Sequence, residues 1–108
     1  MKTLCLIAVS ALFTPAFTAS AADGSALFTK SCASCHGADG KGQTVMGKKL
    51  KAKDYTDAKV QSELTDAAIT KAIKEGVTEG GKVVMKPFKD LTDADVKALT
   101  EKIRSFKK

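Results

Sequence analysis

The chain has 108 residues, with 18 Lys and Arg against 12 Asp and Glu, and a formal net charge of +6. This length accommodates one small domain, and small domains often need a staple or a cofactor to complete their core. Only one of the 18 basic residues is an arginine, Arg104. Because arginine supplies the forked donor that reads bases and phosphates, this composition favours acidic protein partners and argues against nucleic acid.

Residues 1–21 have the pattern of a secretory signal peptide. Lys2 provides a positive start, residues 4–13 are almost all apolar, and Ala19-Ser20-Ala21 is an A-x-A cleavage signal. The apolar run is about ten residues long, whereas a membrane-spanning helix needs about 20. We therefore expect a protein that does not span the membrane, cleavage after Ala21 or Ala22 with loss of Cys5, a periplasmic location, and a mature domain over residues 22–108.

A helix is expected to begin at Asp23 or Gly24 and to run to about Ala33. Phe28 lies within it, four residues before Cys32. Residues four apart share one face of a helix. Phe28 is therefore predicted to pack in the core close to whatever Cys32 holds.

The most informative stretch is Cys32-Ala33-Ser34-Cys35-His36. Two thiols separated by two residues, followed at once by an imidazole, form the attachment signature of a c-type haem. Each sulfur can form a thioether to a vinyl group of the macrocycle, and the histidine can bind the iron as an axial ligand. The stretch predicts one covalent haem c attached through Cys32 and Cys35, with His36 as an iron ligand.

Three alternatives compete for this stretch. A structural zinc site needs about four ligands, and the mature chain has only Cys32, Cys35 and His36 of the usual soft donors. A thioredoxin-like dithiol requires a βαβ context, and no strand pattern precedes Cys32. A simple disulfide leaves the adjacent histidine without a role. The haem interpretation accounts for all three side chains.

The middle of the chain is predicted to be less regular. Three glycines between Gly37 and Gly42 indicate a tight turn around the haem edge. Residues 43–53 look irregular and basic. Tyr55, the only tyrosine, is a candidate to hydrogen-bond a haem propionate, or else a half-buried side chain bonded to backbone.

The second half of the chain carries the clearest helices. A short one is expected after Thr56, and a second one after the N-cap Thr65, with an apolar stripe that includes Ile69 and Ile73. Residues 78–82 are expected to form a flexible loop that leads into an irregular segment with Met85. A last amphipathic helix follows Thr92, which with Asp95 approximates a capping box, and its apolar face carries Val96, Leu99, Ile103 and Phe106. The predicted fold is all-α, with three to five short helices wrapped around one covalent haem.

A second axial ligand must come from a residue other than histidine, because His36 is the only one. The thioethers of Met46 and Met85 are the main candidates; a neutral lysine or an open, water-bound iron are others. Met46 follows His36 by only ten residues, much of them a glycine turn, so the opposite face is hard to reach. Met85 lies far from the motif in the chain, and Pro87 stiffens its segment. Met85 is therefore the predicted ligand.

These features together resemble class I cytochrome c, most closely the small bacterial monohaem forms. The resemblance covers the whole mature chain and rests on the haem motif, the stretch Gly37-Ala38-Asp39-Gly40-Lys41-Gly42, Met85 before Pro87, and the closing helix. It implies that the N- and C-terminal helices cross near Gly24 and Phe28. The family often has an aromatic residue on the last helix at this crossing, where this chain has Lys102.

Two functions follow from these predictions. In the first, His36 and Met85 fill both axial positions, and the protein is a periplasmic carrier of single electrons, without enzymatic activity. In the second, the sixth position is open or displaceable, and the protein is a haem enzyme or small-ligand sensor. A carrier would act as a monomer between acidic-surfaced donor and acceptor proteins such as a reductase or an oxidase. Six lysines are predicted to surround the docking surface: Lys41, Lys48, Lys49, Lys82, Lys86 and Lys89.

Overall fold

The structure is a computed structural model that describes residues 23–108. The predicted signal peptide and Cys5 lie outside the described residues. In chain order the elements are α1 (Gly24–Ser31), α2 (Ala33–His36), α3 (Val45–Leu50), α4 (Ala58–Glu63), α5 (Asp66–Glu75), β1 (Val77–Glu79), β2 (Lys82–Met85) and α6 (Asp93–Ser105). Within this range no helix is long and apolar enough to cross a membrane.

The helices begin where side-chain oxygens satisfy the free backbone N–H groups of a first turn. The Thr65 hydroxyl accepts from Ala68 N at 3.1 Å, so α5 starts as predicted. At α6, Thr92 Oγ1 accepts from Asp95 N at 3.1 Å, and the Asp95 carboxylate accepts from Thr92 N at 2.9 Å. This reciprocal pair is the predicted capping box, with Asp in the place of the usual Glu.

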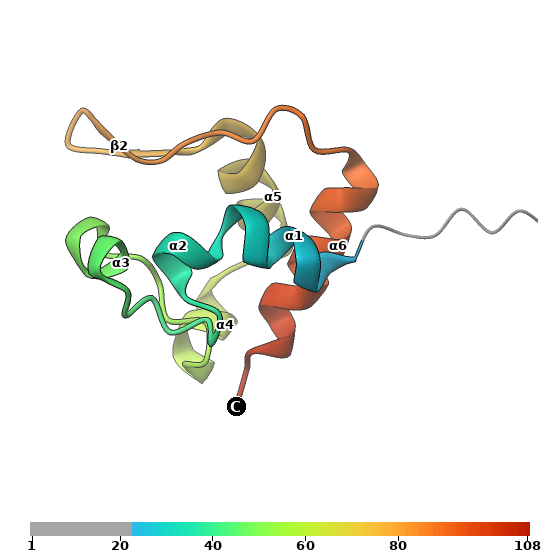
Figure 1. Ribbon diagram of the computed structural model, residues 1–108, viewed down its shortest axis with the longest axis horizontal. Helices are drawn as coiled ribbons and strands as arrows, with labels where there is room; N and C mark the ends of the chain where they lie inside the picture. The colour runs from blue at the N-terminus through green and yellow to red at the C-terminus, as the bar shows by residue number, and fades with distance from the viewer. Residues whose placement is uncertain (1–22) are drawn as a thin grey trace, which may run out of the picture.

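The first and last helices cross (Figure 1). Gly24, the first residue of α1, lies against Ala98 of α6. A Cβ atom on Gly24 would collide with the carbonyl group of Ala98, so the absence of a side chain permits this close approach. Phe28, one turn further along α1, is 1% exposed. Its ring lies 5.0 Å from that of Phe106, over which the Lys102 ammonium sits at 4.7 Å. The predicted crossing is confirmed, and Phe106 supplies the aromatic partner that position 102 lacks.

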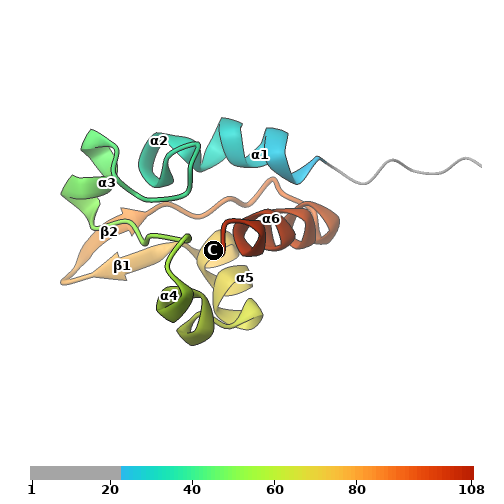
Figure 2. The same ribbon diagram turned by 90° about the horizontal axis from the view of Figure 1, so that it is seen from below.

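Helices α1 and α5 both lie against α6 (Figure 2). The buried apolar residues of the described chain form a core between these helices. Its buried members include the residues at the predicted apolar spacing of the two long helices: Ile69, Ile73, Val96, Leu99 and Ile103. Each is at most 4% exposed. The mostly helical fold class is therefore confirmed, and the core was readable from the 3.6-residue period of α5 and α6.

The number of helices was underestimated: the described residues contain six, where three to five were expected. The predicted helix up to Ala33 breaks at Cys32, where φ is −120° and ψ is −29°, and a second short helix carries the rest of the motif. The prediction of irregular chain over residues 43–53 was also wrong in part. The helix α3 forms there because Thr44 caps it, accepting from Gly47 N at 2.9 Å.

The segment before Met85 is more ordered than predicted. Strands β1 and β2 form an antiparallel hairpin, with Val77 opposite Met85 and a register shift beside Val77. Gly80 and Gly81, at the turn, both have positive φ, 55° and 75°. The prediction of a flexible loop over residues 78–82 was therefore wrong in part. Two glycines between strand-like runs are a sequence signal for this type of hairpin turn, so the sequence contained the information needed to predict it.

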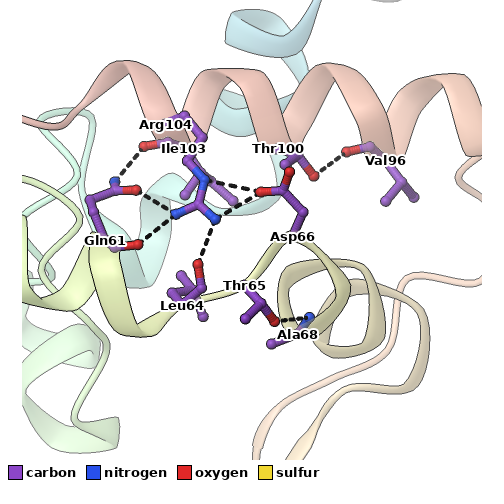
Figure 3. Close-up of polar contacts among 9 residues, drawn as sticks. All are labelled: Gln61, Leu64, Thr65, Asp66, Ala68, Val96, Thr100, Ile103 and Arg104. Atoms are coloured by element: carbon purple, nitrogen blue, oxygen red, sulfur yellow. Dashed lines mark hydrogen bonds and ion pairs between the residues drawn. The ribbon is translucent and has the colours of Figure 1, made fainter.

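The single arginine ties three elements together (Figure 3). Arg104 on α6 donates through Nε and Nη2 to Asp66 at 3.1 and 2.7 Å, and through Nη2 to the Leu64 carbonyl. Its Nη1 donates to the Gln61 main-chain carbonyl at 2.9 Å and to the Gln61 side-chain oxygen at 2.8 Å. The forked guanidinium thereby fixes the end of α4 and the start of α5 against α6, which a lysine cannot reproduce.

Candidate functional site

A cavity of about 470 Å³ opens between α2, α3, α5 and the hairpin. This volume falls within the range of roughly 300–1,000 Å³ typical of cofactor and small-molecule sites. In Figure 1 the hairpin runs above α2, and residues of both elements line the cavity. The apolar part of the wall includes Phe28, Leu64, Ile69, Ile73, Val84 and Phe88.

Cys32 and Cys35 both border this cavity, and no disulfide joins them. Burial, with a smaller contribution from Cys35, raises the pKa of the Cys32 thiol to about 11. The thiol is therefore neutral near pH 7 and sits in apolar surroundings that suit a thioether. Within residues 23–108, no group of three or more His, Cys, Asp or Glu side chains is arranged to hold a metal ion. The zinc alternative thus finds no ligand set in the described part of the chain.

The imidazole of His36 is oriented by a backbone group. Its Nδ1 lies 3.3 Å from the Lys53 carbonyl oxygen. A carbonyl can only accept, so Nδ1 carries the proton and Nε2 keeps its lone pair. Burial lowers the pKa of His36, partly opposed by this hydrogen bond, so the ring is neutral near pH 7. A neutral imidazole held through Nδ1 is the state that binds iron through Nε2.

Tyr55 lies against the same imidazole. The two rings stack with centroids 4.6 Å apart, and the Tyr55 hydroxyl is 3.4 Å from His36 Nε2. Tyr55 is buried, at 7% exposure, and this burial raises the pKa of its hydroxyl. Of the two alternatives predicted for Tyr55, the half-buried side chain bonded to backbone is wrong, because the side chain is buried and its hydroxyl lies near a ring nitrogen. A hydrogen bond to a haem propionate stays a prediction. Because Nε2 is the atom that would bind iron, it is the stacked ring of Tyr55 that would support the orientation of the histidine in the haem-loaded protein.

Both candidate methionines border the cavity, so the structure brings together every residue predicted for the site. They differ in their surroundings. Met46, on α3, is 46% exposed, whereas Met85, at the end of β2, is partly buried and packs against the core.

Two contributors to the site had no signal in the sequence. The Lys53 carbonyl is a backbone group, and the pattern of side chains does not mark it. Gln61 is buried and donates through Nε2 to the Tyr55 carbonyl at 2.7 Å and to the Ile103 carbonyl at 2.9 Å. Arg104 donates a hydrogen bond to the Gln61 side chain. Arg104 is the only arginine in the sequence, and this was the one feature of the sequence that pointed to a special role for Arg104.

Known proteins are similar to this chain in sequence and fold. The family model described as cytochrome c oxidase, cbb3-type, subunit III matches residues 19–101. Among solved structures, the chain is similar to the KustC0563 c-type cytochrome, at 40% identity over 80% of this chain and 99% of that chain, with a TM-score of 0.70. A point mutant of Kustc0563 is similar at 41% identity over 79% and 99%, with a TM-score of 0.67. No curated protein matches the chain significantly.

A mostly helical fold that places a C-x-x-C-H motif at an apolar cavity defines a c-type cytochrome. The chain belongs to the family whose model spans residues 19–101, and it is a small class I cytochrome c. It therefore carries covalently attached haem c, and Cys32 and Cys35 fit the attachment motif. Proteins of this class transfer electrons between redox partners and typically act outside the cytoplasm.

Proposed function

We propose that this protein is a periplasmic monohaem electron carrier in which His36 and Met85 are the axial ligands. The observation that carries the proposal is that both side chains border one cavity with the two attachment thiols. Haem supplies a one-electron couple at this position. Two protein ligands leave no open position for a substrate, and a methionine raises the reduction potential relative to a second histidine.

The surroundings of the two methionines favour Met85. A ligand that stays bound needs a side chain held in place by its packing. Met85 ends a strand that pairs with β1 and packs against the core. Met46 is half exposed and lies on α3, a helix of six residues that begins at Val45, shortly after His36 in the sequence. Its side chain has the freedom of a surface residue.

The test compares the ferric optical spectra of the parent holoprotein, Met85→Ala and Met46→Ala. The weak long-wavelength charge-transfer band of a sulfur–iron(III) bond is expected in the parent and in Met46→Ala, and is expected to be absent in Met85→Ala. The two variants remove the same side chain at the same cavity, so each controls for the other. A band that persists in Met85→Ala and disappears in Met46→Ala would reverse the assignment. Its absence from the parent, together with carbon monoxide binding, would favour the enzyme or sensor function.

We also propose that acidic redox partners, an oxidase among them, dock at the rim formed by α3 and the hairpin. No acidic residue occurs between positions 40 and 53. Lys48 and Lys49 on α3, Lys82 on β2 and Lys86 directly after β2 are all exposed. Among them lie three exposed apolar side chains, Val45 at 90%, Met46 at 46% and Val83 at 59%. A positive rim around apolar side chains suits fast, weak docking of a negatively charged surface.

Charge reversal tests the docking surface. The double variant Lys48→Glu and Lys49→Glu is expected to slow reduction by an acidic partner roughly tenfold at low salt, with the difference shrinking as salt rises. The control reverses Lys71 and Lys97, which are exposed on α5 and α6. It changes net charge equally and should have a much smaller effect. Equal slowing by both variants would show that only net charge matters.

The domain boundaries and location are part of the same proposal. We expect export with cleavage after Ala21 or Ala22, leaving a monomeric domain over residues 22–108. Intact mass of the protein recovered from the periplasmic fraction gives the cleavage site and the haem content together. A full-length mass without haem, recovered from the cytoplasm, would contradict the export proposal. Light scattering of the holoprotein would test the monomer.

A further inference from the structure

The helix α5 ends at Gly76, whose backbone has φ of +75°. The Gly76 N–H donates to the Ala72 carbonyl at 2.9 Å and closes the last turn. Side chains are disfavoured in this left-handed region, and glycine is the usual residue just past a helix end. Helix termination alone would explain a glycine here.

A second feature of Gly76 is independent of its φ angle. The chain that carries Met85 passes directly over its Cα atom. A methyl group on Gly76 would lie 2.5 Å from the Met85 carbonyl oxygen, 2.9 Å from Pro87 N and 3.0 Å from Pro87 Cδ. These neighbours are backbone atoms and a proline ring, so they cannot move aside as the end of a flexible side chain can.

The same turn of α5 binds the Met85 segment at another point. The Phe88 N–H donates to the Ile73 carbonyl at 2.8 Å. On the other side, Val77 pairs with Met85 in the hairpin. Residues 85–88 are thus attached to the end of α5 by a hydrogen bond, a strand pairing and a close backbone contact. Ile73 also lines the cavity, so the helix that forms part of the cavity wall also holds the Met85 segment in place.

We infer that Gly76 is a positioning residue for Met85, because the missing side chain sets how closely the Met85 backbone approaches the haem cavity. This inference rests on the proposed function, in which Met85 binds the iron. An added methyl group would force the Met85 backbone to retreat by about 1 Å to restore an ordinary contact. Ligand constellations must be held within roughly 0.5 Å of their productive geometry. The sulfur–iron bond then lengthens or opens, and the sixth position becomes available to external ligands.

The chain offers a matched control for the strain of a positive φ. Gly81, in the hairpin turn, has the same φ of +75°, and a methyl group added to it would have no heavy atom within 4 Å. Gly76→Ala and Gly81→Ala both place a side chain at a φ of +75°, and only the first adds the contact with Met85 and Pro87. If Gly76→Ala does not accumulate, Gly76→Asn and Gly81→Asn replace them. Asparagine tolerates positive φ better than alanine and still carries the Cβ atom.

The readouts are the ferric sulfur–iron charge-transfer band and imidazole binding to the ferric holoprotein. We expect Gly76→Ala to lose most of the band and to bind imidazole at least about tenfold more tightly, because apparent affinity scales with the fraction of molecules whose sixth position is open. Gly81→Ala should match the parent in both. A folded Gly76 variant with the parent's band and affinity would overturn the inference, as would equal changes in both variants. If the parent itself lacks the band, the proposed ligation fails as well; a band lost in Met85→Ala but kept in Gly76→Ala refutes only the positioning role.

Discussion

Replacing Gln61 by leucine tests the polar network that supports the haem-facing side of the fold. Gln61 is 5% exposed, and its side chain makes three hydrogen bonds: to the Tyr55 and Ile103 carbonyls and from Arg104 Nη1. Leucine has nearly the same size and can make none of them. Arg104 keeps its bond to the Gln61 main-chain carbonyl, so the variant removes the side-chain contacts alone.

The expected loss can be worked out from these contacts. A neutral hydrogen bond contributes about 1 kcal/mol net, and one to a charged group about 1.5–3 kcal/mol. Two neutral bonds and one to the guanidinium give about 4 kcal/mol, and the greater hydrophobicity of leucine returns roughly 1 kcal/mol. A net loss of about 3 kcal/mol corresponds to a fall in Tm of about 12–24 °C for a domain of this size.

The assay is thermal and guanidinium unfolding of the holoprotein, followed by helical circular dichroism. Ser62→Ala is the control, because Ser62 is the next residue on α4, is exposed, and bonds only within its own turn. It should change the free energy of unfolding by less than about 0.5 kcal/mol. A fall in Tm below about 5 °C for Gln61→Leu would refute the reasoning, because the Tyr55 and Ile103 carbonyls would then have no need of Gln61.

Three further predictions concern the pH response, a helix cap and the haem. Hydrogen bonds from the Thr56 side chain and backbone lower the pKa of Asp54. The ionised carboxylate therefore stabilises the fold above about pH 4, and this contribution is lost as the pH falls. Asp54→Asn should melt at a lower temperature than the parent at pH 7, and the melting temperatures of the two proteins should converge in acid. Thr92→Ala removes the N-cap of α6 and should cost about 1 kcal/mol in chemical denaturation, whereas Thr92→Ser should recover it. Protein without haem, made as the Cys32→Ser and Cys35→Ser double variant, should lose much of its helical circular dichroism. The reason is that an unfilled cavity of about 470 Å³ leaves a small core without packing contacts. A native-like cooperative melt would contradict this.

The elements that could be predicted correctly from the sequence are those with local causes. Thr65 and Thr92 start their helices through contacts with residues three positions away, and Ile69 with Ile73 shows the helical period directly. Apart from the hairpin, whose Gly80-Gly81 turn was a signal in the sequence, the errors fall where no such local pattern exists. The helix α3 has little apolar periodicity, and its cap also bonds back to the carbonyls of Ser34 and Cys35, which only the folded chain brings near.

The attachment motif is the feature of this protein that the amino-acid sequence determines most completely. Covalent attachment of haem depends on two thiols and an imidazole within five residues, so Cys32, Cys35 and His36 specify it without knowledge of the rest of the fold. The surroundings of the motif, in contrast, depend on the rest of the fold. Backbone groups help to orient His36 and to hold the Met85 segment: the carbonyl of Lys53, the carbonyl of Ile73 and the bare Cα of Gly76. Every residue has a carbonyl group and the chain has eight glycines, so only the tertiary structure, by bringing distant segments into contact, decides which of them act.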